Sequence, residues 1–297
     1  MHQLAAFIRL SRLYFLPMPV LTYLIGLAAA QHEREMLNVR MLWAGLGIEL
    51  LVQLSVAYLN DYWDIPTDRI NTRRTLLSGG SGELTTGVLS PRVALIAGIT
   101  CQISAALLAF WIGIPDISWP ILVLALAAAF FYTAPPLRLA WRGLGELTTS
   151  SVAALGVPMW AYSLQTGRLN SDLLILGLPL MLFIMSLFVA IATPDYDADR
   201  RVGKHTLPVI VGQRRIASLY AGLLALAYIA SILLWPMRVP AAVLIGLAAS
   251  VPLALWAWRG LHTPSHAGTL ALTWMIFRAG LLPLEIIIVL NLGLRFV

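Results

Sequence analysis

Long apolar stretches separated by short polar segments make up most of the chain. Nine of them approach the length of about 20 residues with which an α-helix crosses the hydrocarbon core of a bilayer. They cover residues 13–30, 41–59, 93–112, 119–132, 147–164, 173–193, 216–235, 239–258 and 270–290. The pattern therefore predicts an all-α, polytopic membrane bundle of about nine transmembrane helices.

Composition supports this class. Hydrophobic residues make up 59% of the chain and charged residues only 11%, whereas soluble domains carry about 25% charged residues. Cys101 is the single cysteine, which excludes an intrachain disulfide and a C-x-x-C metal or redox site.

The positive charge is distributed unevenly between the loops. The net charge is +6, and among the 20 basic residues Lys204 is the one lysine. In a soluble protein this excess would suggest nucleic acid as a partner, but in a membrane protein it indicates orientation and no nucleic acid is expected. Fourteen basic residues fall on the N-terminal side of the predicted membrane and five on the other. We therefore place the N-terminus, and the loops after spans two, four, six and eight, in the cytoplasm.

Negative charge is concentrated in two short segments. Six of the 14 acidic residues lie in residues 60–68 and 195–199, which close the second and sixth apolar runs. Both segments are expected to open on the cytoplasmic face. Hard divalent cations such as Mg²⁺ prefer carboxylate oxygen and often share their shell with substrate phosphates.

The spacing within each segment supports a metal site. Asn60, Asp64 and Asp68 recur every four residues and lie on one face if the helix continues, and Asp195 and Asp199 repeat the arrangement. Carboxylates on one face repel each other unless a cation compensates. The alternative is a solvated helix end.

Basic and glycine-rich segments follow the acidic ones. Arg73 precedes the run Ser-Gly-Gly-Ser-Gly at residues 78–82, and the second acidic segment leads into Lys204. Glycines let backbone amides approach a phosphate closely. A metal together with basic side chains suits a diphosphate, and a lipid tail on that diphosphate would explain a site that opens from the membrane interior.

These motifs resemble those of the UbiA superfamily of intramembrane prenyltransferases. Residues 60–68 match its N-D-x-x-D-x-x-x-D motif, and residues 195–207 match D-x-x-x-D followed by G-K-x-T. Residues 132–146 resemble the family's loop between the fourth and fifth helices, and residues 12–17 resemble the entry to its first helix. The resemblance extends over the whole chain. It implies a single domain, 1–297, with helices around a central cavity and a cytoplasmic cap.

The resemblance also implies a reaction. Mg²⁺ bridges the aspartate motifs to a polyprenyl diphosphate, diphosphate leaves, and the allylic cation alkylates a small acceptor. The implied ligands of metal and diphosphate are Asn60, Asp64, Asp68, Asp195 and Asp199. Lys204, Arg138 and Arg73 would neutralise the leaving group, and Tyr132 is an aromatic candidate near the mouth.

The branch of the superfamily is predicted from the finer motifs. Residues 78–82, the Pro-Pro loop and residues 194–199 are most similar to 1,4-dihydroxy-2-naphthoate prenyltransferases of menaquinone biosynthesis. Related sequences often carry Asn shortly before the second motif, where this chain has Ile191-Ala192-Thr193. Prenylation of 4-hydroxybenzoate, a tetrapyrrole or a non-aromatic acceptor therefore stays open.

Charged residues within the apolar runs are expected to face inward, because they are costly in lipid. Glu49 and Gln53 continue the polar stripe of the first motif deeper into the bundle, and we predict that they line the cavity and bind substrate, with Glu49 in contact with the acceptor. Arg278 and Glu285 lie in the ninth run. A structural ion pair between Glu49 and Arg278 is the alternative.

A transporter or lipid-binding module is the competing class of protein. Transporter sites usually lie near the midplane between inverted repeats, whereas both acidic segments here have the same orientation and lie at one surface. The sequence therefore favours a reaction site that opens to the cytoplasm, in the plasma membrane of a prokaryote.

Overall fold

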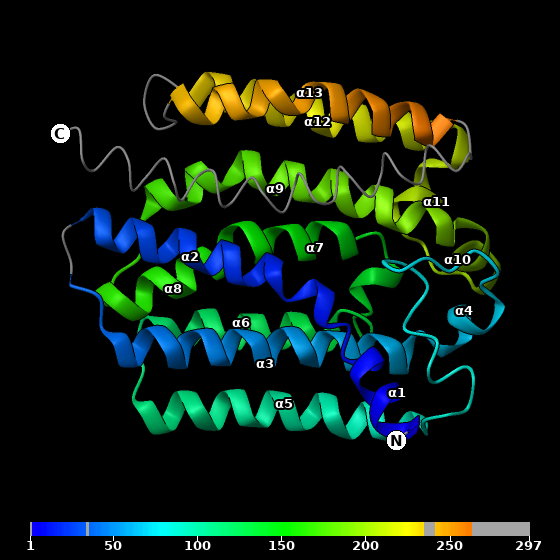
Figure 1. Ribbon diagram of the computed structural model, residues 1–297, viewed down its shortest axis with the longest axis horizontal. Helices are drawn as coiled ribbons and strands as arrows, with labels where there is room; N and C mark the ends of the chain where they lie inside the picture. Colours follow the sequence, from blue (N-terminus) through cyan, green and yellow to red (C-terminus); the bar gives the residue numbers. More distant parts are fainter. Residues whose placement is uncertain (1, 34–35, 235–240, 263–297) are drawn as a thin grey trace.

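The computed structural model describes residues 2–33, 36–234 and 241–262, and in these ranges the ordered secondary structure is helical, without strands. The long helices run side by side, and the short helices gather at one end of the bundle (Figure 1). The predicted all-α class is confirmed.

Each of the first eight predicted apolar runs corresponds to a helical stretch. These are α2 (Pro17–His32), α3 (Val39–Trp63), α5 (Pro91–Ile112), α6 (Ser118–Phe131), the continuous stretch of α7 (Gly145–Ser151), η3 (Val152–Gly156) and α8 (Val157–Thr166), then α9 (Ser171–Ala192), α12 (Ile216–Leu234) and α13 (Ala241–His262). The ninth run, 270–290, lies outside the described residues, as do Arg278 and Glu285. Among the described helices, four are long and apolar enough to cross a membrane, or five if the bent pair His2–Phe15 and Pro17–His32 forms one span. The number nine stays a prediction.

Local sequence signals begin and end these helices. The Asn38 side chain accepts a hydrogen bond from the Met41 amide at the start of α3, and Asn170 caps α9 in the same way. Gly113 and Gly167 end α5 and α8 in the left-handed conformation, where a side chain would be strained.

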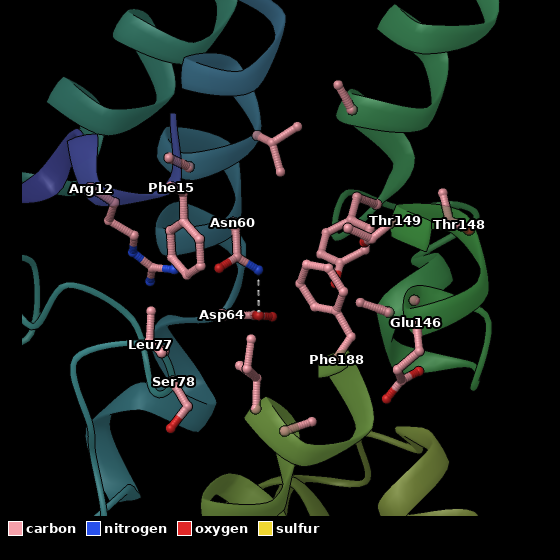
Figure 2. A pocket seen from close by; sticks show the side chains of 18 of the residues that line it. Arg12, Phe15, Asn60, Asp64, Leu77, Ser78, Glu146, Thr148, Thr149 and Phe188 are labelled. Atoms are coloured by element: carbon pink, nitrogen blue, oxygen red, sulfur yellow. Dashed lines mark hydrogen bonds between the residues drawn. The ribbon is translucent and has the colours of Figure 1, made fainter. Parts of the chain in front are cut away.

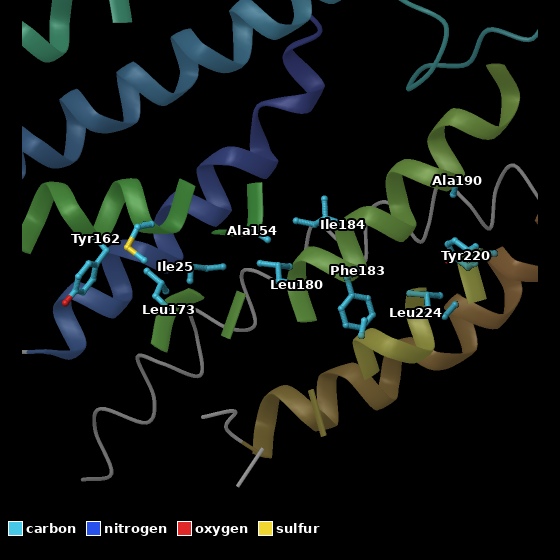
Figure 3. Close-up of a cluster of buried hydrophobic side chains, with 14 of the residues drawn as sticks. Ile25, Ala154, Tyr162, Leu173, Leu180, Phe183, Ile184, Ala190, Tyr220 and Leu224 are labelled. Carbon is cyan, nitrogen blue, oxygen red and sulfur yellow. The ribbon is translucent and has the colours of Figure 1, made fainter. Parts of the chain in front are cut away.

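The largest buried core lies between α9, α12 and α2. Ile184, Phe183 and Tyr220 belong to this cluster, with Ile25 of α2 at its other side (Figure 3). Helix α3 packs on α5, and α2 packs on α8. This packing leaves a cavity between α3, α6, the α7–α8 stretch and α9.

A layer of short helices lies at one end of the bundle, and we refer to this layer as the cap. It is built from α1 (His2–Leu10), α4 (Ile65–Ile70), α10 (Tyr196–Val202) and α11 (Leu207–Val211), which lie together on the right of Figure 1. Pro66 begins α4, and Pro194 lies in η4 (Thr193–Asp195) between α9 and α10. The breaks therefore fall beside the two acidic motifs.

Candidate active site

A cavity of about 220 Å³ opens beneath the cap. Helix α3 lines it from Glu49 to Asp64, a length of about 22 Å at 1.5 Å per residue. Its capped end is polar and charged (Figure 2). Between the capped end and Glu49 its wall carries mostly valine and alanine side chains: Val52, Val56, Ala57, Ala125, Ala128, Ala129, Val152, Ala153 and Val157.

The first acidic motif forms one continuous face at the junction of α3 and α4. The Asn60 side-chain amide donates a hydrogen bond to Asp64 Oδ2 at 2.8 Å (Figure 2). The Asp68 backbone amide donates to the Asp64 carbonyl at 2.9 Å, which continues the helical spacing. All three residues line the cavity, as their spacing predicts.

The second motif approaches the first from α9 and α10. Asp195 accepts hydrogen bonds from Asn71 Nδ2 at 2.6 Å and from the Gly79 amide at 3.0 Å. Asp199 accepts one from Thr206 Oγ1 at 3.3 Å, while its Oδ1 is buried without a hydrogen bond in the described part of the chain. Both aspartates line the cavity.

Lys204 joins the two motifs. Its ammonium group donates a hydrogen bond to Asp64 Oδ2 at 2.7 Å and lies 3.7 Å from Asp199 Oδ1. Burial alone would lower the pKa of Lys204, but the adjacent Asp64 and Asp199 outweigh burial and raise it. Lys204 is therefore a permanent positive charge between the aspartates.

The carboxyl groups at this end crowd one another, which disfavours their ionised forms. Burial raises the pKa of Asp68 to about 8, and the nearby carboxylates of Asp64 and Asp61 add to the shift. Among the described residues, no three acidic, histidine or cysteine side chains converge closely enough to hold a metal ion. The all-oxygen donors nevertheless suit Mg²⁺, and Asp199 Oδ1 offers a buried acceptor without a hydrogen bond.

The glycine-rich loop closes over the acidic motifs. The sequence assigns these backbone amides to phosphate, but here they donate hydrogen bonds to carboxylates. The Gly79 amide donates to Asp195 and the Ser81 amide donates to Asp61, both at 3.0 Å. A side chain at Gly80 would overlap the Asp68 carboxylate, and its φ of 69° also favours glycine. The loop therefore fixes the aspartates in place.

Two predicted basic residues do not line the cavity. Arg73 pairs with Asp197 at 3.3 Å, with side chains that are 62% and 49% exposed. Arg138 lies over the Trp141 ring at 5.0 Å, and the Trp141 indole donates a hydrogen bond to Asp64 Oδ1 at 2.8 Å. Arg138 therefore contacts Trp141, which in turn contacts Asp64.

The remaining predicted residues, Tyr132, Glu49 and Gln53, line the cavity. So do Arg12, Phe15, Phe188 and Glu146, which the sequence analysis does not assign (Figure 2). Arg12 forms an ion pair with Asp61. Glu146 Oε1 accepts a hydrogen bond from the Leu207 backbone amide at 3.1 Å. Glu146 Oε2 is buried and has no hydrogen-bond partner among the described residues. Arg12 and Glu146 do belong to segments that carry the resemblance, and that is the one signal that could have identified them.

The match to a family model decides the assignment. The model described as the UbiA prenyltransferase family matches residues 19–281. The chain belongs to the UbiA prenyltransferase family.

The names of curated proteins that are similar to this UbiA family member indicate different acceptors. It is 23% identical to a 1,4-dihydroxy-2-naphthoate octaprenyltransferase of Bacillus subtilis over 61% of the chain, and it spans 58% of that protein. It is 30% identical to the protein of the same name from Mycobacterium tuberculosis, over 71% of each chain. It is also 26% identical to a digeranylgeranylglyceryl phosphate synthase of Natronomonas pharaonis, over 74% of the chain and 69% of that protein.

Solved structures share the fold of this UbiA family member. A UbiA homologue from Archaeoglobus fulgidus, bound to DMAPP and Mg²⁺, superposes with a TM-score of 0.67 at 17% identity, over 95% of this chain and 99% of the other. This likeness confirms the fold of an integral membrane protein.

Proposed function

We propose that this protein is a Mg²⁺-dependent prenyltransferase that transfers a prenyl group from a polyprenyl diphosphate to a lipophilic acceptor. The observation that carries the proposal is a single cavity with both aspartate motifs and Lys204 at its capped end and a mostly apolar wall beyond them. A prenyl diphosphate has the same division between a charged head and a hydrocarbon tail.

The diphosphate would bind at the capped end. Asn60, Asp64, Asp68, Asp195 and Asp199 would hold Mg²⁺, which when bound supplies positive charge to the diphosphate oxygens. The homologue bound to DMAPP and Mg²⁺ supports this assignment. Because Lys204 lies between Asp64 and Asp199, it would have to exchange Asp64 for a diphosphate oxygen as substrate binds.

Lys204 would then assist departure of the leaving group. The allylic carbon–oxygen bond breaks, and its electron pair leaves on the diphosphate oxygen. A charge-assisted hydrogen bond from Lys204 strengthens as negative charge develops there, which lowers the barrier. Arg138 would support this step by holding Trp141 against Asp64. Arg73 would reach the diphosphate only after leaving Asp197.

The cavity wall would protect the allylic cation. Tyr132, Phe15 and Phe188 line the cavity near its capped end, and aromatic faces attract cations. The apolar wall keeps water from capturing the cation. The acceptor donates an electron pair to the cation and forms the new bond, and the attacking atom then loses a proton or, where that atom is a carboxylate-bearing carbon, carbon dioxide.

The proposed acceptor is 1,4-dihydroxy-2-naphthoate, in menaquinone biosynthesis. The motifs of the sequence and two similar proteins of that name support it. The similarity to a digeranylgeranylglyceryl phosphate synthase supports a non-aromatic acceptor as the second candidate. Prenylation of 4-hydroxybenzoate or a tetrapyrrole is tested beside them.

The location of the active site is part of the proposal. The bias of basic residues toward one set of loops supports an N-terminus and a cavity mouth in the cytoplasm, in the plasma membrane of a prokaryote. Labelling of single cysteines placed in the cap and in the opposite loops of intact cells would test this orientation.

The purified protein tests the activity. It would be incubated with Mg²⁺, prenyl diphosphates and each candidate acceptor, with release of inorganic diphosphate and product mass as readouts. We expect diphosphate and one prenylated product, both lost when a chelator removes Mg²⁺. If no diphosphate is released with any acceptor in the panel, the proposal is contradicted and a transporter or lipid-binding module is favoured.

A further inference from the structure

A second polar group lies at the end of the cavity opposite the cap. Glu49 lines the cavity from α3 at the end away from the cap, and Gln53 lines it four positions nearer the cap, beside Val52. The Glu49 residue is only 7% exposed. The cavity therefore changes from charged to apolar and back to polar along α3.

Neither side chain is satisfied by its described neighbours. Within residues 2–33, 36–234 and 241–262, Glu49 and Gln53 form no side-chain hydrogen bond or ion pair. The nearby Tyr23 hydroxyl donates instead to the Leu42 carbonyl at 3.0 Å. Buried polar groups are normally hydrogen-bonded. Within the described parts of the structure, water in the cavity is therefore what can supply hydrogen bonds to Glu49 and Gln53.

The length of α3 fixes how far this pair lies from the reacting carbon. Glu49 precedes Asn60 by eleven positions, which is about 16 Å along the helix. One isoprene unit adds four carbon–carbon bonds to the tail, or about 5 Å when extended. Glu49 therefore lies about three isoprene units from the diphosphate. The acceptor must lie beside the first carbon, so Glu49 faces the tail and not the acceptor.

We propose that Glu49 ends the tail-binding part of the cavity and determines how many isoprene units contribute to binding. This inference rests on the proposed function. Hydrocarbon laid over the carboxyl group would displace water and return no hydrogen bond, which is unfavourable. Units beyond the third therefore gain no contact at this end and turn aside toward the bilayer.

A series of prenyl diphosphates with two, three, four and five isoprene units tests the inference. For the native protein, kcat/KM rises from two to three units and then stays level. In Glu49→Leu the apolar wall continues, so the fourth unit raises kcat/KM by about tenfold. The gain lies in KM and not in kcat, because the tail is remote from the reacting carbon.

Glu49→Gln is the matched control, because it keeps the size and the polarity of the side chain. We expect it to keep the native profile, level after three units. The inference is overturned if the native protein gains equally from a fourth unit, or if Glu49→Leu leaves the profile unchanged. A loss of thermal stability and activity in Glu49→Leu that is equal at every tail length would also overturn it, and would indicate an ion pair with Arg278.

Binding of unreactive thiodiphosphate analogues of the same lengths, measured by thermal shift, gives the profile without turnover. If no diphosphate is released at any length but the analogues still show the level profile and its change in Glu49→Leu, the proposed function fails and the length assignment stands. If turnover is normal and the two profiles are identical, the length assignment alone fails.

Discussion

Lys204 donates a hydrogen bond to Asp64 at 2.7 Å, although the two residues are 140 positions apart in the chain. The contact depends on α10 lying against α4, which brings the second acidic motif to the first. It also places the one lysine of the chain where the proposed metal and diphosphate would bind.

Removal of Lys204 should lower turnover strongly. Lys204→Ala takes away a donor aimed at the departing diphosphate, and loss of one such donor typically lowers kcat by about 10²–10³. Lys204→Arg should recover only part of the rate, because a guanidinium group needs a planar, forked approach where an ammonium group acts as a point charge. Steady-state release of diphosphate measures both.

Arg200 provides the matched control. It is exposed and lies on α10, four positions before Lys204, so Arg200→Ala changes the net charge equally without touching the cavity. A near-native rate in Arg200→Ala and in both Lys204 variants would mean that Lys204 only contributes to orientation in the membrane.

The aspartates that line the cavity should be essential, and their exposed neighbour should not. Asp64→Asn and Asp195→Asn each remove a carboxylate from the proposed metal site, so turnover should be abolished while the helical circular dichroism signal stays native. Asp197→Asn, which lies two residues from Asp195 but faces solvent beside Arg73, should keep nearly full activity. Full activity in either cavity variant would remove the metal assignment.

Gly80 should not tolerate a side chain. Gly80→Ala pushes a methyl group into the Asp68 carboxylate and adds backbone strain at a φ of 69°, which costs about 1–2 kcal/mol. Gly87 has a φ of 75° with nothing within 4 Å of an added Cβ, so Gly87→Ala carries the strain alone. We expect a larger loss of thermal stability in Gly80→Ala than in Gly87→Ala, and a loss of Mg²⁺-dependent activity in Gly80→Ala only. Equal activities would show that the loop does not position Asp68.

Periodicity made the polar face of the first acidic motif predictable. Asn60, Asp64 and Asp68 are separated by four residues, and helical geometry alone then places them on one side of the chain. The apolar runs predicted the long helices for the same reason, since hydrogen-bonded helices are the simplest way to cross lipid. These features depend on local sequence.

Long-range contacts were not predictable in the same way. Arg73 and Arg138 carry the expected charge, but packing directs Arg73 to Asp197 and Arg138 onto Trp141. Arg12 is one of many arginines, and its place in the cavity follows from the turn between α1 and α2, where its φ is 44°. The sequence contains no periodic signal for such a contact.

The ion pair between Arg12 and Asp61 should stabilise the cap. The Asp61 side chain is 2% exposed, and it also accepts hydrogen bonds from Ser81 of the glycine-rich loop. Arg12→Ala leaves this carboxylate buried without its cation, which typically costs about 3–5 kcal/mol. Asp61→Asn in the same protein removes the unpaired charge, so the double variant should be more stable than Arg12→Ala alone. Thermal unfolding in detergent measures the coupling. Arg73→Ala is the control, because Arg73 pairs with Asp197 at the surface, with side chains that are 62% and 49% exposed, and exposed pairs contribute little. Additive losses in the double variant would show that the two residues do not act as a pair.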